Sequence, residues 1–299
     1  MRVALARTVR ALPVGDGLAY EPKFDGHRMV VVRSDAGVVL QARSGRVVTA
    51  AFPDLAVAAR QLPPGTTLDG EVVVWHAGRT DFALVQRRAA ATPARATVLA
   101  ARLPASYAAF DVLELAGLDV RARPYERRRT LLVDLLLPLG PPLQPVPMTT
   151  DPELAATWYE TLPASGIEGL VIKRLDQSYP AGRRIWQKLR HTDVRDAAVV
   201  GFTGTPRRPL ALVLVLPGAE DEPPVVSSPL SPPARVALTR VLAARLPSPG
   251  ATGVATAIGR GEVPYHLVDP PLSAEVRATA GRHPPPEVLR VRTDVTPDA

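Results

Sequence analysis

The sequence predicts an α+β protein with two parts of unequal size. Up to about residue 193, β-rich runs alternate with segments of helical periodicity, a pattern typical of sheets covered by helices. Beyond that residue, short β-like runs dominate, and Pro- and Gly-rich turns separate them. The chain has 299 residues, of which 46% are hydrophobic, so it can bury the cores of one or two domains. We therefore expect one domain over residues 1–193 and a second over 194–299.

The N-terminal part is expected to combine mixed or antiparallel sheets with helices. Residues 28–33 and 37–43 flank the turn SDAG and predict a hairpin. The helix expected at 124–137 has a proline at its start, where the missing N–H costs nothing. Further strands are expected at 67–75, 106–115, 117–122, 169–174 and 184–190, and further helices at 52–62, 81–90 and 151–162.

The C-terminal part reads as a small β-barrel. The boundary is expected near HTDVRD, residues 191–196, and the Pro-rich stretches 138–147 and 217–233 are expected to be loops. Five short strands with one inserted helix suit a barrel such as an OB-fold. These strands are expected at 197–204, 210–217, 265–270, 274–279 and 288–294, with the helix at 233–246.

Composition and charge narrow the class of protein. No apolar run approaches the ~20 residues that span a bilayer, and the N-terminal segment lacks a secretory signal, so a cytoplasmic protein is expected. The chain has no cysteine, which excludes disulfides, thiolate metal sites and cysteine nucleophiles. The formal net charge is +7, with most of the excess in the N-terminal part. A polyanionic partner such as nucleic acid would suit this charge.

Lysine is rare in this chain, which has 33 arginines and only Lys23, Lys173 and Lys188. An arginine stays protonated, whereas a lysine amine can lose its proton and act as a nucleophile. The three lysines are therefore candidates for chemistry. None is preceded by Gly and followed by Ser or Thr, so a P-loop is excluded. LVIKR lacks the glycine-rich loop, HRD and DFG segments that would accompany it in a protein kinase.

Each lysine lies in one of five ordered motifs. Lys23 belongs to K-F-D-G-H-R, and the others follow as L-D-G-E at 68–71, Y-A-A-F-D-V at 107–112, E-G-L-V-I-K at 168–173 and W-Q-K-L-R at 186–190. This series resembles the nucleotidyltransferase superfamily of ATP-dependent DNA ligases, RNA ligases and mRNA capping enzymes. The resemblance implies a ligase-type nucleotidyltransferase domain, also described as ATP-grasp-like, in which Lys23 attacks the α-phosphate of ATP and forms lysyl-AMP.

The resemblance also implies roles for the other motif residues. Attack needs the neutral amine, which nearby cations favour, and Arg28, Lys188 and bound Mg²⁺ are candidates for this effect. Glu71 would contact the ribose and the metal, and Glu168 would help to hold the metal, Mg²⁺ or Mn²⁺. Phe110 would stack on adenine and Glu21 would lie at the adenine edge. Lys173 and Lys188 would bind the α-phosphate. Arg190 stands where family members often have a lysine, and it too would bind phosphate.

Two further segments bear on the choice within the superfamily. Arg43 lies in an R-x-G pattern followed by F-P-x-L, which resembles DNA ligases, where such an arginine engages phosphates of the nucleotide or of the nicked strand. The stretch DFALVQRR also resembles a bacterial ligase segment.

Near the C-terminus, L-R-V-R-T-D-V resembles the last motif of the superfamily. Arg292 and Asp294 would orient the pyrophosphate, although Val295 replaces the usual lysine.

We expect an ATP-dependent DNA ligase that acts as a monomer on nicked duplex DNA in the cytoplasm, associated with the nucleoid. Its size and motifs resemble the small bacterial ligases of repair and end joining. An RNA ligase or capping-type enzyme shares the lysine chemistry and stays open as an alternative. A non-catalytic nucleic-acid-binding relative is the second alternative, because Arg190 and Val295 depart from the family pattern.

Overall fold

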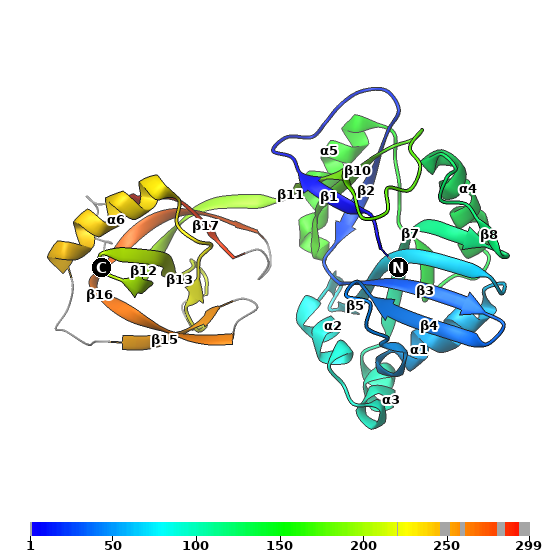
Figure 1. The fold of residues 1–299 in the computed structure, drawn as a ribbon, viewed down its shortest axis with the longest axis horizontal. Coiled ribbons are helices and arrows are strands. Elements are labelled where there is room, and N and C mark those ends of the chain that lie inside the picture. The colour runs from blue at the N-terminus through cyan, green and yellow to red at the C-terminus, as the bar shows by residue number, and fades with distance from the viewer. Residues whose placement is uncertain (1, 220, 246–251, 258–260, 280–284, 293–299) are drawn as a thin grey trace. The chain divides into compact units, whose positions relative to one another are not determined.

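The computed structural model describes residues 2–219, 221–245, 252–257, 261–279 and 285–292 (Figure 1). The chain forms two compact units, residues 1–190 and 191–299. The division falls at the start of strand β12 (Thr192–Thr205), which contains most of the stretch expected at the boundary. No helix in the described part of the chain has the length and apolar character needed to cross a membrane.

The larger sheet of the first unit has seven strands in the order β4-β3-β5-β7-β8, with β6 paired to β5 and β9 paired to β7. All of its pairings are antiparallel except β7 with β9. The hairpin β3–β4 and strands β5 and β7 confirm the expected β runs. The strands are β3 (His27–Ser34), β4 (Gly37–Ala42), β5 (Thr66–His76), β6 (Arg79–Thr80), β7 (Ala105–Leu115), β8 (Leu118–Asp119) and β9 (Leu143–Pro145).

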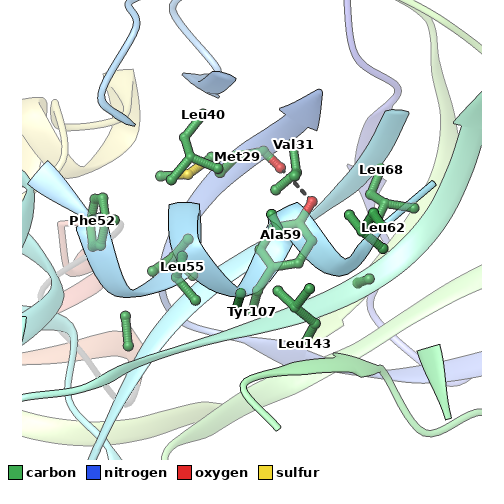
Figure 2. Packing of buried hydrophobic residues seen from close by; sticks show 14 of the residues in the cluster. Met29, Val31, Leu40, Phe52, Leu55, Ala59, Leu62, Leu68, Tyr107 and Leu143 are labelled. Carbon is green, nitrogen blue, oxygen red and sulfur yellow. Dashed lines mark hydrogen bonds between the residues drawn. The ribbon is translucent and has the colours of Figure 1, made fainter. Parts of the chain in front are cut away.

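Helices pack on this sheet around the main hydrophobic core of the unit (Figure 2). Phe52 and Leu55 are fully buried, and the Tyr107 hydroxyl donates to the Met29 carbonyl across the sheet at 2.9 Å. Burying a leucine or phenylalanine side chain stabilises a fold by about 1.5–3 kcal/mol, so this cluster holds the helices in place. The helical segments are α1 (Pro53–Ala58), α2 (Phe82–Ala89), α3 (Pro93–Arg102) and α4 (Tyr125–Leu136), with 3₁₀ turns η1 (Thr49–Ala51) and η2 (Ala59–Gln61).

Helix α3 was not predicted from the sequence. It begins at Pro93, directly after Thr92, and only Ala96 and Leu99 are buried. Val98 and Leu99 are its only large apolar residues, so the segment offers few core residues from which to predict a helix. Its start signal, Thr-Pro, also occurs in loops, so the sequence alone did not distinguish the two.

A second, four-stranded sheet completes the first unit, in the order β1-β11-β10-β2. Strand β1 runs parallel to β11, and the other two pairings are antiparallel. Tyr20, Leu170 and Ile172 pack with Ala155 in a small core beneath α5. The elements are β1 (Leu5–Thr8), β2 (Leu18–Phe24), α5 (Pro152–Thr161), η3 (Leu162–Ser165), β10 (Ile167–Arg174) and β11 (Arg184–Arg190). Strand β1 was also not predicted, because it is short and half exposed.

The second unit is a sheet whose pairings form a closed ring. Strand β12 pairs with both β13 and β16, and β14 and β15 complete the circuit. Strand β17 pairs with β16 outside the ring. Ala234, Leu238 and Leu242 of α6 pack on the apolar interior. The elements are β13 (Arg208–Val215), β14 (Val225–Val226), α6 (Pro232–Arg245), β15 (Thr252–Ala257), β16 (Gly261–Thr279) and β17 (Glu287–Arg292).

The strand assignment in this unit needs correction. The runs at 265–270 and 274–279, expected as two strands, belong to the single strand β16. Its pairing with β12 shifts between Val199, opposite Leu272, and Gly201, opposite Leu267. The residues between Leu267 and Leu272 bulge there, so Pro270 and Pro271 interrupt the ladder without ending the strand. Strand β14, of two residues, lies within the stretch 217–233 that was expected to be a loop, as β9 of the first unit lies within 138–147. Strand β15 was not predicted.

Candidate functional site

Residues from both sheets of the first unit line a cavity of about 210 Å³. Seven of its lining side chains are basic and two are acidic, so the cavity favours an anionic ligand. The cavity brings together most of the predicted site residues, from sequence positions more than 160 residues apart. Its lining residues are Leu5, Ala6, Glu21, Pro22, Lys23, Phe24, Arg28, Arg43, Glu71, Phe110, Val171, Lys173, Arg184, Trp186, Lys188 and Arg190.

Lys23 lies near the end of β2, with 19% of its side chain exposed. Its Nζ is 2.5 Å from Glu168 Oε2, because β2 and β10 pair with Lys23 opposite Gly169. A Cβ on Gly26, three residues later, would lie 2.2 Å from the Val72 carbonyl oxygen. The K-x-D-G turn therefore needs a glycine to pass this close to strand β5. The turn places the amine against the cavity and next to a carboxylate.

Glu168 connects three charged groups of the motifs. Besides Lys23, it contacts Arg190, whose Nε lies 3.2 Å from the same carboxylate oxygen. Burial disfavours the ionised form of Glu168, but Lys23 and Arg190 outweigh this effect and hold its pKa below the usual value. Burial, and then the charge of Glu168, raise the pKa of Asp25 to about 7. Near neutral pH, Asp25 is therefore partly protonated, whereas its neighbour Glu168 is ionised.

Glu71 is the other acidic residue predicted to contact the metal. Burial raises the pKa of Glu71 to about 8, against the effects of Lys23 and Arg28 and with smaller contributions from Asp69 and Glu168. A cation bound next to Glu71 would stabilise its ionised form, which burial disfavours. In the described residues no group of three or more His, Asp or Glu side chains has the arrangement of a metal site. Mg²⁺ keeps several waters and needs only one or two carboxylates, so Glu71 and Glu168 fit it.

Arg28 is fixed by Asp69 at the wall of the cavity. Its Nε and Nη2 donate to the Asp69 carboxylate at 3.0 and 2.6 Å, and its Nη1 donates to the Ala4 carbonyl at 2.6 Å. The Tyr179 hydroxyl donates to the same carboxylate at 2.5 Å. The guanidinium carbon lies 5.1 Å from the centre of the Phe110 ring. Because Asp69 and the Ala4 carbonyl take most of its donors, Arg28 has a fixed orientation.

Lys173 is only 2% exposed and has its own set of partners. Its Nζ lies 2.7 Å from Glu21 Oε2, and it donates to the Phe110 carbonyl at 2.8 Å. The Tyr125 hydroxyl donates to the other oxygen of Glu21, and the Trp186 ring centre is 4.4 Å from the ammonium. Burial lowers the pKa of Lys173, and Glu21 opposes this effect. Its expected contact with the α-phosphate stays a prediction, as does the contact of Glu21 with adenine.

Lys188, Arg43 and Phe110 line the cavity as well. Lys188 is half-buried, and burial together with Arg190 and Lys23 lowers its pKa to about 8. Arg43 is exposed just after β4. The Phe110 ring makes an edge-on contact with Trp186, with centroids 5.9 Å apart. The cavity thus has an aromatic wall beside a row of cations.

The last motif lies in the second unit. Arg292 Nη2 is 3.1 Å from Asp196 Oδ1, and both side chains are substantially exposed. Asp294 and Val295 lie outside the described residues. The predicted orientation of pyrophosphate by Arg292 and Asp294 stays a prediction.

Comparison with known proteins supports the resemblance to ligases that the five motifs indicated. Residues 5–190 match the family model of the ATP dependent DNA ligase domain. The chain belongs to the ATP-dependent DNA ligase family. DNA ligase C2 of Mycolicibacterium smegmatis is 35% identical over 199 residues, which cover 66% of this chain and 56% of that protein. DNA ligase C of Mycobacterium tuberculosis is 34% identical over 203 residues, with the same coverage. The chain thus spans little more than half the length of these two curated relatives.

Solved structures resemble the chain over almost its whole length. A mycobacterial DNA ligase D complexed with ATP and MES is 26% identical, covers 99% of this chain with 96% of its own, and superposes with a TM-score of 0.57. A structure described as a Lig E DNA ligase, 18% identical, covers 98% of this chain and 100% of its own with a TM-score of 0.62. The Lig E likeness supports the fold alone.

Several residues of this ligase-family site were not assigned from the sequence. Trp186 and Arg184 line the cavity, and Tyr125 and Tyr179 hold Glu21 and Asp69. Trp186 opens the W-Q-K-L-R motif, so its position was a usable signal. The two tyrosines had none, because each reaches its carboxylate from more than 100 residues away in the sequence.

Proposed function

We propose that the protein is an ATP-dependent DNA ligase that seals nicks in duplex DNA, with a role in DNA repair. The observation that carries the proposal is the cationic cavity in which Lys23 contacts Glu168, in a chain of the ATP-dependent DNA ligase family. A triphosphate is a fitting ligand for a cavity with five more basic than acidic side chains.

In the first step, Lys23 Nζ forms a bond to the α-phosphorus of ATP as the bond to the β-phosphate oxygen breaks. Pyrophosphate leaves, and the proton of the amine passes to solvent. Lys188, Arg184 and Arg43 would stabilise the phosphate charge that develops in this transition state. Phe110 and Trp186 offer the adenine an aromatic wall, and Glu21 would accept from its exocyclic amine.

A divalent cation, Mg²⁺ or Mn²⁺, would be held by Glu71 and Glu168. When bound it would neutralise phosphate charge. Without it, Lys23 and Arg190 hold the Glu168 carboxylate. Because Lys23 Nζ contacts the Glu168 carboxylate, the amine must leave this carboxylate before it attacks the α-phosphorus.

In the second step, an oxygen of the DNA 5′-phosphate attacks the phosphorus of lysyl-AMP, the P–N bond breaks and Lys23 regains a proton. The 3′-hydroxyl oxygen at the nick then forms a bond to the phosphorus of the 5′-phosphate as the bond from that phosphorus to AMP breaks. AMP leaves, and the hydroxyl proton passes to solvent. We propose that the second unit is an OB-fold domain that binds the duplex in these steps. Its ring of paired strands with one inserted helix suits that fold. The exposed Arg207, Arg208 and Arg240 would suit a phosphate backbone.

The test is to incubate the full chain with Mg²⁺ and α-labelled ATP, beside Lys23→Arg as the matched control, which keeps the charge. We expect covalent label on the wild type alone, and its loss when nicked duplex DNA is added. Absence of label on folded wild-type protein would contradict the enzymatic proposal and favour a non-catalytic nucleic-acid-binding relative. Label that nicked RNA or 5′-diphosphate RNA discharges, and nicked DNA does not, would assign the protein to the RNA ligase or capping type.

A further inference from the structure

The hairpin between β5 and β6 carries an exposed aromatic residue close to the reactive lysine. Trp75 is 45% exposed and is the only aromatic among the large exposed hydrophobic residues of the described part of the chain. His76 and Arg79 beside it are exposed too. The turn residues Ala77 and Gly78 both have positive φ, 48° and 79°, as in the tight type I′ turns of hairpins. The hairpin therefore presents Trp75 and a cation on a short, well-defined turn.

Trp75 lies on the face of β5 that lines the cavity. Side chains alternate along a strand, so Glu71, Val73 and Trp75 share one face, whereas Val72 and Val74 point into the main core. Glu71 lines the cavity. At about 3.3 Å per residue, Trp75 lies roughly 13 Å further along the same face. The face of the sheet that begins at the candidate metal residue thus ends at an exposed tryptophan.

Phe24 connects Trp75 to the reactive lysine. It directly follows Lys23, it lines the cavity, and its ring makes an edge-on contact with Trp75 with centroids 6.5 Å apart. The base of the hairpin is fixed on its other side. The Thr80 hydroxyl donates to the Gly166 carbonyl at 2.8 Å, two residues before Glu168. The hairpin is therefore attached both to the strand that carries Lys23 and to the segment that leads to Glu168.

We propose that this hairpin contacts the duplex at the break, with Trp75 packed against the nucleotide at the nick and Arg79 paired with a backbone phosphate. The inference rests on the proposed function, because a 5′-phosphate must reach Lys23 to take its AMP. At a nick the backbone of one strand is interrupted, so the flanking base pairs can separate and offer a base or sugar face to an aromatic side chain. An exposed tryptophan beside an arginine, on the face that leads to Lys23, offers this substrate a stacking surface and a cation for a phosphate.

The test starts from enzyme that already carries labelled AMP on Lys23, mixed with increasing nicked DNA under single-turnover conditions. We expect Trp75→Ala to raise the DNA concentration for half-maximal discharge at least about fivefold, since stacking on an aromatic contributes about 1–3 kcal/mol per base. Trp75→Phe should restore most of the loss. Arg79→Ala should weaken binding and reduce the salt slope of the DNA affinity by about one. Leu118→Ala, which truncates a residue 63% exposed in the same unit, is the matched control.

A second measurement does not depend on a truncated side chain. The change in tryptophan fluorescence on adding nicked DNA should be larger for the wild type than for Trp75→Phe. Half-maximal concentrations within twofold for wild type and Trp75→Ala, with equal fluorescence changes for wild type and Trp75→Phe, would overturn this proposal and leave the ligase function standing. A wild type that takes no label, or keeps it in the presence of nicked DNA, would overturn the proposed function itself.

Discussion

The ammonium nitrogen of Lys173 lies 2.7 Å from Glu21 Oε2, and these side chains are 1% and 2% exposed. Tyr125 donates to the second oxygen of Glu21, and Phe110 accepts from Lys173 through its carbonyl. This buried network joins β2, β7, α4 and β10, so it ties the two sheets of the first unit together beside the cavity. Lys173 thus helps to hold the two sheets together, a role that the motif alone did not indicate.

Removing one partner of this buried pair should destabilise the first unit. Lys173→Met leaves Glu21 Oε2 without its close partner, while Tyr125 and, at 4.0 Å, Arg129 stay at Oε1. Breaking such a buried pair typically costs about 3–5 kcal/mol of unfolding free energy. Urea unfolding monitored by circular dichroism measures this change. The double variant Glu21→Gln/Lys173→Met should recover part of the loss, because it also removes the carboxylate charge that Lys173 neutralised. Equal stability of Lys173→Met and wild type would contradict the assignment.

The pKa of Lys188 predicts how the capture of ATP depends on pH. Because this pKa is lowered to about 8, the cationic form is present below pH 8 and is lost above it. The second-order rate constant for labelling at low ATP, which reports groups of the free enzyme, should therefore fall above about pH 8, approaching tenfold per pH unit.

Lys188→Arg separates this effect from the titration of Glu71, whose pKa is also about 8. Arginine stays charged, so the variant should lose the fall above pH 8 even if its maximal rate is lower. The rate constant for labelling is measured with α-labelled ATP from pH 6.5 to about pH 10, and the shapes of the two pH profiles are compared. A fall at the same pH in both proteins would show that Lys188 is not the group responsible.

A third prediction concerns the attachment of α4 to the larger sheet. Arg128 is buried, and its Nε and Nη2 donate to the Asp111 carboxylate at 2.7 and 2.9 Å. Arg128→Met should cost about 3–5 kcal/mol, because it leaves Asp111 buried and unpaired. The neighbouring Arg127 is exposed, so Arg127→Met should stay within about 0.5 kcal/mol of the wild type. Thermal and urea unfolding of the two variants would test this contrast, and equal losses would refute it.

Some helices and strands were predicted from the sequence and others were missed. Strands β5 and β7 were predicted because they are long β-like runs, and α4 was predicted because a proline marks its start. Helix α3 was missed because it buries little, and β1 because a short strand gains its backbone partners only from β11. Strand β16 was divided in two because a sequence pattern does not distinguish a bulge at Pro270 and Pro271 from a turn.

The sequence by itself showed the motifs that predict the chemistry, because K-x-D-G, L-D-G-E, E-G-L-V-I-K and W-Q-K-L-R are each a short run of neighbouring residues. Only the tertiary structure decided which charges meet. Glu168 reached Lys23 through the pairing of β10 with β2, and Lys173 reached Glu21 through the same pair of strands. The positions of Tyr125, Tyr179 and Trp75 next to Glu21, Asp69 and Phe24 also depend on the tertiary structure. The physical reason is that ion pairing, burial and pKa depend on distance in space, which strand register and packing set and which sequence spacing does not.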